Sequence, residues 1–401
     1  MEKKFVHYAA NEDNPKWERM TIREEELYQK PNESRTEFGR DHSRILFSNS
    51  YRRLKNKTQV FFSPKDDHIC TRIEHVNNVE CVSYNIANCL GLNTELTRAI
   101  AIAHDLGHAP FGHKGEKVLS NISQEELGEK FWHEKNGLYL VDNIELLENT
   151  KGKKKNLNLT YAVRDGIISH CGEIDENALK PREGFIDLAN YTKPNEYAPF
   201  TWEACVVKIA DKISYLGRDI EDAISLGILE EQELDELRPL FNYVRDKINN
   251  TVIISTLIGD LINNSSVEKG LVFSENCFNM ISTVKKFNYF HIYQNKRLAP
   301  SDRYFNYVIR EIYQFFVELF DGENTWDYIQ KYKKYYPKIV EKFIEWLEKY
   351  IDLPNRKELE LDNKIVYNIC DKKDYIRAVI TYISGMTDNY AIETYYNIVS
   401  F

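Results

Sequence analysis

The sequence predicts an all-α protein. Apolar residues recur at intervals of three and four over most of the 401 residues, and this spacing is the period of an amphipathic helix. We find no clear run with the period-two alternation of a half-buried strand. The chain has only 17 Gly and 11 Pro, and 42% of its residues are apolar, so it can form a large packed core.

The first two well-defined helices lie near the middle of the N-terminal half. Apolar residues follow helical spacing from Arg72 to Leu90, and Gly91 stands where a helix C-cap is expected. A second helix should begin at Asn93-Thr94, since both residues are good N-caps. We expect it to stop at Gly107, with His104-Asp105 in its last turn.

A third helix should begin at Thr201 and run through Ile220, which places Asp211, Tyr215 and Asp219 on one face. Helical spacing also covers residues 257–262, 304–320, 339–351 and 375–383, and breaks are expected at 150–158, 180–199 and 298–302. None of these breaks resembles a long linker. We therefore expect one helical body, with an N-terminal segment (1–60), a core (61–270) and a C-terminal helical portion (271–401).

Charge and composition exclude several classes of protein. There are 53 Lys and Arg against 62 Asp and Glu, a net charge of −9, so the chain is not a generally basic nucleic-acid coat. Seven cysteines without a C-x-x-C pair indicate reduced thiols in a cytoplasmic protein. The N-terminal residues lack the apolar run of a signal peptide. The most apolar later stretch, 252–262, contains Asp260 and is too short to span a membrane, so no membrane partner is expected.

Candidate metal ligands cluster in one part of the chain. Five of the ten histidines lie between residues 75 and 133, although a single histidine is more often a core or surface residue. His104 and Asp105 are adjacent, and both could reach a cation if His75 and Asp211 on other helices supplied further ligands. Because this set lacks thiolates, it favours Mn, Fe, Co, Ni or Mg over a structural zinc.

Longer strings around these residues carry a family resemblance. They are Arg40–Phe61, Thr71–His75, Arg98–Glu116, Tyr161–Gly172, Lys208–Ala223 and Tyr382–Tyr395. In sequence and order they resemble the deoxyguanosinetriphosphate triphosphohydrolase (dGTPase-like) family of the HD-domain metal-dependent phosphohydrolase superfamily. The resemblance spans nearly the whole chain.

The resemblance implies an HD-domain helical bundle with an additional C-terminal helical portion that completes the nucleotide pocket and makes subunit contacts. It implies hydrolysis of dGTP or other dNTPs to the deoxynucleoside and tripolyphosphate, in a homo-oligomer that is a tetramer or a hexamer. The divalent metal (Mn, Mg, Fe, Co or Ni) would be held by His75, His104, Asp105 and Asp211, and it would polarise the α-phosphate and activate a water.

The same resemblance assigns roles on the phosphate side. His113 matches the family's catalytic histidine, which would protonate the leaving 5′-oxygen, and Glu116 matches the carboxylate that orients it. His133 resembles a second phosphate-side histidine. His108 resembles a further one, although it could equally cap a helix end. Arg72 matches an arginine that grips α-phosphate oxygens, with a surface salt bridge as the alternative.

Recognition of the nucleoside is carried by a shorter match. Gln59 resembles a residue beside the deoxyribose, Asp219 the acceptor of the 3′-hydroxyl and Tyr215 a wall of the sugar pocket. Tyr293 and Gln294 resemble the pair that closes on the sugar and excludes a 2′-hydroxyl. In a chain with 26 tyrosines, Tyr293 could equally be a packing residue.

Some interpretations stay open. The basic loop 151–155 is either a solvated turn or a contact for an allosteric dNTP or single-stranded DNA. The aromatic and basic run 326–350 has the composition of a nucleic-acid contact, but amphipathic helices are the simpler interpretation. The alternative functions are another HD-domain phosphohydrolase, namely a 5′-nucleotidase or phosphodiesterase, and a sensor whose metal site is vestigial.

Overall fold

The all-α prediction is confirmed by the structure, a computed structural model. It describes residues 3–27, 32–62, 66–171, 177–241 and 249–400, so Gly172 at the end of one of the six strings lies outside the described residues. The described chain contains seventeen α-helices and one two-stranded sheet. It divides into two compact units, each assembled from three separate stretches.

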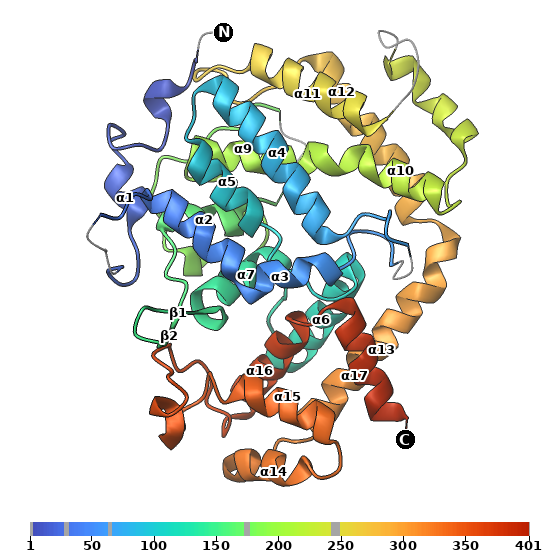
Figure 1. Cartoon of the computed structure of the whole chain (residues 1–401). Coiled ribbons are helices and arrows are strands. Elements are labelled where there is room, and N and C mark those ends of the chain that lie inside the picture. The colour runs from blue at the N-terminus through green and yellow to red at the C-terminus, as the bar shows by residue number, and fades with distance from the viewer. Residues whose placement is uncertain (1–2, 28–31, 63–65, 172–176, 242–248, 401) are drawn as a thin grey trace. The chain divides into compact units, whose positions relative to one another are not determined.

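The first unit consists of residues 1–45, 63–105 and 159–300. Its α-helices, some of which extend slightly past these limits, are α1 (Trp17–Thr21), α2 (Glu37–Phe47), α4 (Arg72–Leu90), α5 (Thr94–Ala103), α8 (Tyr161–Ser169), α9 (Trp202–Leu216), α10 (Arg218–Ser225), α11 (Asn250–Asn264) and α12 (Glu275–Phe287). Figure 1 shows α4 packed across α5 and α9, and these helices carry the candidate metal ligands.

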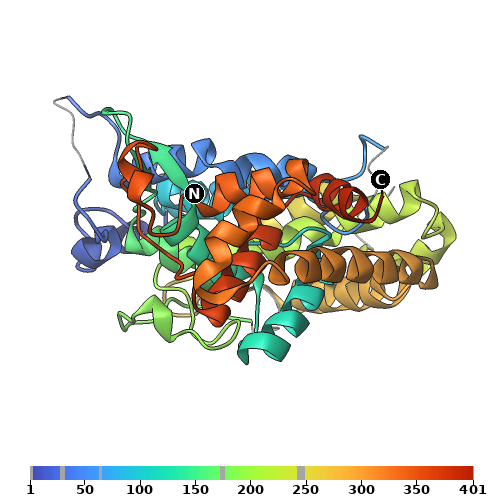
Figure 2. The ribbon, with the colours of Figure 1, turned by 90° about the horizontal axis from the view of Figure 1, so that it is seen from below.

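The second unit consists of residues 46–62, 106–158 and 301–401. Its elements are α3 (Asn49–Arg53), α6 (Gly112–Leu127), α7 (His133–Tyr139), β1 (Leu146–Glu148), β2 (Lys154–Asn156), α13 (Ala299–Val317), α14 (Thr325–Tyr332), α15 (Pro337–Leu347), α16 (Lys372–Ser384) and α17 (Asp388–Val399). The C-terminal helices are the orange and red ribbons of Figure 2.

Short helices of other types complete the elements. The 3-10 helices are Val6–Tyr8, Leu54–Asn56, Leu188–Asn190, Glu231–Glu236, Arg238–Phe241, Lys296–Leu298, Gly322–Asn324 and Pro354–Lys357, and the π-helical turns are Leu140–Ile144 and Asn288–Tyr293. The π-turn at 288–293 continues α12 and carries Tyr293.

The helix expected from Arg72 to Leu90 is confirmed as α4. Thr71 and Glu74 form a capping box at its N-terminus, which satisfies two backbone N–H groups that have no partner within the helix. At the other end Gly91 adopts a φ of 86°, a conformation that favours glycine. The next helix, α5, begins after the Asn93 N-cap as expected.

Three expected boundaries are wrong. Helix α5 ends at Ala103 instead of Gly107, so His104 is its C-cap and Asp105 lies in the turn that follows. The helix expected from Thr201 through Ile220 divides at Gly217 into α9 and α10. A side chain at Gly217 would collide with Asn250 at the start of α11, where an added Cβ would lie 2.7 Å from the Asn250 Cα. Close packing of α11 therefore accompanies this division.

The third wrong boundary is the break expected at 298–302, because α13 starts at Ala299 and runs through this segment. Pro300 falls in the first turn, where a missing N–H costs nothing. One short hairpin lies where the sequence shows no clear period-two run. Residues 146–148 and 154–156 pair as an antiparallel hairpin with Leu147 opposite Lys155, and the turn between them contains Gly152 at a φ of 78°.

Aromatic side chains fill the core of the second unit. Phe316, Phe343 and Tyr382 pack with ring centroids 4.5 to 5.4 Å apart. Ile339, Phe343, Leu347 and Tyr350 are buried, so the spacing of 339–350 reflects one apolar face of α15 and the residues that follow it. None of the helices in the described part of the chain combines the length and hydropathy needed to cross a bilayer.

The backbone beside Gly107 explains why a glycine is needed there. Gly107 does not end a helix. Instead, a Cβ at this position would overlap the His133 carbonyl and the Gly137 backbone at α7. The Asn136 side chain also donates to the Gly107 carbonyl at 2.7 Å. The segment between His104 and His113 therefore passes against α7 at a distance that only glycine permits.

We expect Gly107→Ala to lower the free energy of unfolding by about 3 kcal/mol or more, because two backbone segments must separate to admit a methyl group. Urea unfolding followed by circular dichroism measures this change. Gly259→Ala is the matched control, since an added Cβ in the middle of α11 meets no atom of the described residues within 4 Å. That variant should gain about 0.5 to 1 kcal/mol. Equal stabilities of the two variants would contradict the close approach.

Candidate active site

Four of the sequence-predicted residues come together in the first unit. His75 on α4 and Asp211 on α9 are joined by a contact of 3.0 Å between His75 Nε2 and Asp211 Oδ1. His104 Nε2 lies 3.5 Å from Asp105 Oδ1 and 3.8 Å from Asp211 Oδ1. His75 Nε2 lies 3.9 Å from Asp105 Oδ2. We call these four residues the His-Asp cluster.

The imidazole of His104 is held in a ligand-competent orientation. Its Nδ1 is 2.7 Å from the Ala101 carbonyl oxygen, so Nδ1 carries the hydrogen and Nε2 keeps its lone pair. Nε2 is buried and has no hydrogen-bond partner within the described part of the chain. A buried nitrogen acceptor among carboxylates is the environment that a divalent cation would satisfy, so the donor set fits a metal.

The charges of the cluster are strongly coupled. Burial alone would lower the pKa of the His75 imidazole, but its contact with Asp211 outweighs burial and raises this pKa. Burial would raise the pKa of the Asp211 carboxyl, but His75 and His104 together lower it. The carboxylate is therefore ionised at neutral pH, which is the state that a metal ligand requires.

Arg72 does not form a surface salt bridge. Its side chain is 1% exposed, and Nη1 donates to Asp105 Oδ2 at 2.6 Å. A buried arginine at this position restrains one oxygen of Asp105 while the other faces His104. The guanidinium thus orients a carboxylate of the His-Asp cluster.

Three histidines converge on Glu116 in the second unit. Its Oε2 lies 3.3 Å from His113 Nδ1, 3.2 Å from His133 Nδ1 and 3.8 Å from His108 Nδ1. The His108 and His133 rings stack with centroids 3.8 Å apart. We call these four residues the His-Glu cluster, and they could also hold a cation.

Glu116 is the anion of this cluster. Burial raises the pKa of its carboxyl, but the neighbouring His133, together with His113 and His108, outweighs burial and holds the pKa well below its ordinary value. The carboxylate faces Nδ1 of both His113 and His133, which leaves Nε2 of each ring directed away from it. The His113 side chain is 66% exposed, so its Nε2 is accessible to a substrate.

His113 lies at the start of a new helix. It is the second residue of α6, and Phe111 at the N-cap adopts a left-handed conformation with a φ of 64°. Such a conformation is uncommon for a bulky residue and marks a sharply turned segment. The turn separates His113 from the helix that leads to His104.

The sugar-side residues are divided between the units. In the first unit, the Tyr293 hydroxyl donates to Asp219 Oδ2 at 2.5 Å. Burial, Asp219 and the nearby Tyr215 raise the pKa of Tyr293 well above its ordinary value, so the phenol stays protonated and serves as a donor. Gln294 is exposed. Gln59 belongs to the second unit, where it is half-buried.

Sequence reasoning missed the residues that hold the segment between the two clusters. Asp388 at the start of α17 accepts hydrogen bonds from the backbone N–H of Thr58 and of Phe111, each at 2.8 Å. Lys57 Nζ is buried and donates to the carbonyls of His108 and Ser384. These residues lie in two of the strings that carry the family resemblance, and that was their only signal in the sequence.

Two protein-family models and several known proteins match this chain. The HD domain family matches residues 72–216, and the phosphohydrolase-associated domain family matches residues 327–397. A deoxyguanosinetriphosphate triphosphohydrolase-like protein of Caldanaerobacter subterraneus is 32% identical over 361 residues, which cover 90% of this chain and 84% of the relative. Similarly named proteins of Rickettsia bellii and Desulfatibacillum aliphaticivorans are 31% and 35% identical, over 92% and 65% of this chain and 93% and 67% of each relative.

We expect Asp388→Ala to cost about 2 to 5 kcal/mol of unfolding free energy, because two buried N–H groups lose their acceptor. Asp388→Asn should cost less, since the amide retains one acceptor oxygen. Asp371→Ala is the control. Asp371 is an exposed N-cap that accepts from Asp374 N at 2.9 Å, and its loss should cost about 1 kcal/mol. Thermal unfolding compares the three. If Asp388→Ala were no less stable than Asp371→Ala, Asp388 would not hold the segment.

Proposed function

This chain belongs to the deoxyguanosinetriphosphate triphosphohydrolase-like family of HD-domain phosphohydrolases, and we propose that it hydrolyses deoxynucleoside triphosphates to the deoxynucleoside and inorganic tripolyphosphate. The observation that carries the proposal is the His-Asp cluster. His75, His104-Asp105 and Asp211 come from three distant parts of the sequence, and their ligand atoms lie within 3.0 to 3.9 Å of one another in the contacts given above.

In this proposal the His-Asp cluster binds the catalytic cation. When bound, a divalent cation supplies Lewis-acid activation of the α-phosphate and of the attacking water. Asp211 and Asp105 contribute negative charge, and His104 presents the Nε2 lone pair. Arg72 keeps Asp105 in place, and its planar guanidinium is suited to contact with an α-phosphate oxygen.

In this proposal the His-Glu cluster supplies the proton that the leaving 5′-oxygen needs. Water attack on the α-phosphorus expels the 5′-oxygen, which needs a proton as the bond breaks. His113 would donate that proton from Nε2, because Glu116 occupies Nδ1 and stabilises the imidazolium. His133 shares the same carboxylate, and with His108 it would supply further donors to the phosphates.

Selection of the deoxyribose is assigned to Asp219, Tyr293, Tyr215, Gln294 and Gln59. The hydrogen bond from Tyr293 to Asp219 fixes the phenol ring, and a fixed ring is a better steric barrier to a 2′-hydroxyl than a mobile one. Asp219 would accept a hydrogen bond from the 3′-hydroxyl.

Product analysis tests the proposal. The protein is incubated with each of the four dNTPs and GTP, in turn with Mn, Mg, Fe, Co and Ni, and products are separated by chromatography. We expect deoxynucleoside and tripolyphosphate in equal amounts. Orthophosphate or a nucleoside monophosphate would instead identify a nucleotidase or phosphodiesterase of the same superfamily, and the absence of turnover with every metal would indicate a sensor. Multi-angle light scattering tests the tetramer or hexamer that the family resemblance implies.

We expect Asp211→Ala to lose the tightly bound cation and turnover together, because it removes an ionised ligand contributed by a distant part of the sequence. Elemental analysis of the purified protein measures the metal. Asp219→Ala is the control two helical turns further along the chain. It should keep the metal, since Asp219 is bonded to Tyr293 and lies outside the His-Asp cluster. A full metal complement in Asp211→Ala would remove Asp211 from the ligand set.

His113→Ala should keep its metal and still bind a dNTP, yet lose turnover by about a hundredfold to ten-thousandfold, the usual contribution of a positioned acid. Glu116→Ala should lose less, because it orients the imidazole and does not transfer the proton. Rapid-quench kinetics at saturating substrate measure both. Turnover of His113→Ala near the wild-type rate would move the acid role to His133 or His108.

Tyr293→Ala should lose most of its preference for dGTP over GTP, because the steric barrier to the 2′-hydroxyl is gone. Tyr293→Phe keeps the ring but loses the hydrogen bond to Asp219, so it should retain most of the preference. The ratio of kcat/KM for the two nucleotides measures the discrimination. An unchanged ratio in Tyr293→Ala would make Tyr293 a packing residue.

A further inference from the structure

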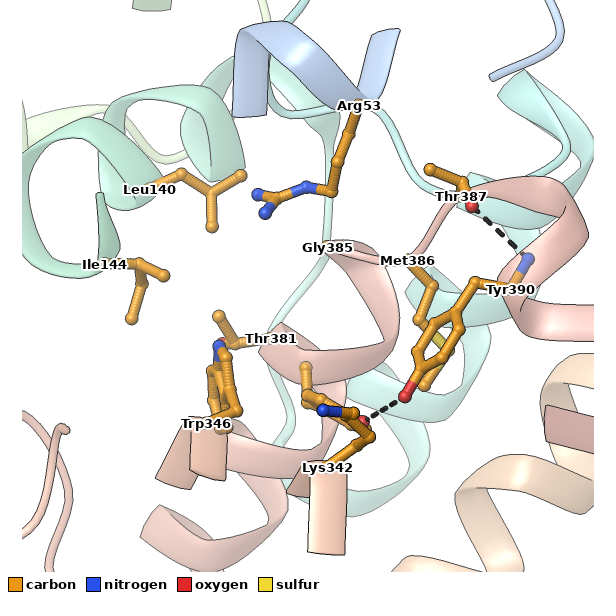
Figure 3. Close-up of a pocket in the computed structure, with 11 residues that line it drawn as sticks. Arg53, Leu140, Ile144, Lys342, Trp346, Thr381, Gly385, Met386, Thr387 and Tyr390 are labelled. Carbon is orange, nitrogen blue, oxygen red and sulfur yellow. Dashed lines mark hydrogen bonds between the residues drawn. The ribbon is translucent and has the colours of Figure 1, made fainter. Parts of the chain in front are cut away.

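A cavity of about 260 Å³ lies in the second unit, apart from the residues of the His-Glu cluster. Its wall is formed by α3, α15, the π-turn at 140–144 and the segment that joins α16 to α17. Figure 3 shows Arg53 extending from α3 toward Gly385, with Lys342 and Trp346 on the opposite side and Tyr390 closing a third side.

Arg53 gives the cavity an incompletely satisfied cation. Its Nη2 donates to Glu145 Oε1 at 2.9 Å and to Ser50 Oγ at 2.8 Å. Its Nε is buried and has no acceptor among the residues that the structure describes. A buried donor of a charged group without an acceptor is costly. An anion in the cavity would add a partner for the guanidinium.

The Glu145 carboxylate is shared among several donors besides Arg53. It accepts from the backbone N–H groups of Asn49 and Ser50 at 2.8 and 3.0 Å, and from Ser50 Oγ at 2.5 Å. Lys342 adds a second cation to the wall, with its ammonium paired to Glu345 at 2.7 Å. Among the described residues that line the cavity, none is a carboxylate.

The remaining wall suits a planar ring. Trp346 and Tyr390 present aromatic surfaces, and Met386 adds a thioether that packs well against aromatic rings. The volume is just below the range of about 300 to 1,000 Å³ that is usual for ligand pockets. It therefore fits one ring system with one small charged group, and not a nucleoside triphosphate with its three phosphates.

The cavity adjoins the residues that hold the segment carrying His108 and Phe111. Gly385, Met386 and Thr387 line it, and the flanking residues are Ser384 and Asp388. Ser384 accepts from Lys57 through its carbonyl at 2.9 Å, and Asp388 accepts from Phe111 N at 2.8 Å. A ligand that orders residues 385–387 would therefore also restrain the segment carrying His108 and Phe111.

We propose that this cavity binds a small compound with one aromatic ring system and one anionic group, whose anion contacts the Arg53 guanidinium and Lys342 while its ring packs against Trp346 and Tyr390. Two sources share this chemistry, a nucleoside monophosphate and an aromatic carboxylate. The inference does not depend on the proposed hydrolysis, because it concerns the cavity alone.

Isothermal titration calorimetry of the full chain tests the proposal with four probes. Deoxyadenosine monophosphate and 4-hydroxybenzoate carry both ring and anion, deoxyadenosine carries a ring without the anion, and inorganic phosphate carries an anion without the ring. We expect deoxyadenosine monophosphate, 4-hydroxybenzoate or both to bind at least tenfold more tightly than deoxyadenosine and inorganic phosphate. Whichever of the two ring-bearing anions binds more tightly identifies the source. Equal binding of deoxyadenosine and its monophosphate, or binding of neither ring-bearing anion, would overturn the proposal.

Two variants assign the binding to this cavity. Gly385→Leu should fill it, since an added Cβ would lie 3.9 Å from Arg53 Nη2 and the backbone φ of −76° accepts any residue, and affinity should fall at least tenfold. Lys342→Glu leaves the wall intact and should weaken binding about threefold to tenfold through charge reversal. Lys333→Glu is the matched control, because Lys333 also pairs with a carboxylate at 2.6 Å but does not line the cavity. Affinities unchanged in both Gly385→Leu and Lys342→Glu would place the binding elsewhere and overturn the assignment.

Discussion

The close approach of Gly107 to α7 is the constraint on which the arrangement of the His-Glu cluster depends. The chain leaves α5 at Ala103, contributes His104 and Asp105 to the His-Asp cluster, and supplies His108 to the His-Glu cluster three residues later. The connection after Asp105 is short. Its course is determined by backbone contact with α7 at Gly107, by the Asn136 hydrogen bond to the Gly107 carbonyl and by the left-handed turn at Phe111.

Buried carboxylates do most of the positioning in the second unit, and each serves several donors. Glu116 faces three histidines, Glu145 accepts from the start of α3 and from Arg53, and Asp388 accepts from two backbone N–H groups. Burial alone raises the pKa of a carboxyl group, so a buried carboxylate persists only with such partners. The pKa values of Glu116 and Asp388 are shifted in opposite directions. The neighbouring histidines lower the pKa of Glu116, whereas burial outweighs the hydrogen bonds of Asp388 and raises its pKa.

The two clusters use histidine in different ways. His104 is buried, and the Ala101 carbonyl sets its tautomer, so the available nitrogen is a lone pair. The exposed His113 has Glu116 beside Nδ1, and its available nitrogen is a donor when the ring is protonated. The same side chain is therefore prepared as a metal ligand in one setting and as an acid in the other. The group at the opposite ring nitrogen makes the difference.

The sequence by itself determined the helical class, the bounds of α4 with its glycine cap, and the family to which the chain belongs, because periodicity, capping residues and local strings are properties of neighbouring residues. The sequence alone did not predict the division of α9 from α10 at Gly217, the early end of α5, the hairpin at 146–156 or the role of Asp388. Apart from the hairpin, which is a local pairing, these features depend on contact with residues far away in the chain: Asn250 against Gly217, α7 against Gly107, Thr58 and Phe111 at Asp388. Spacing identifies which residues can form a helix or a site, but only tertiary packing decides where a backbone has room for a side chain and which buried donors a carboxylate must satisfy.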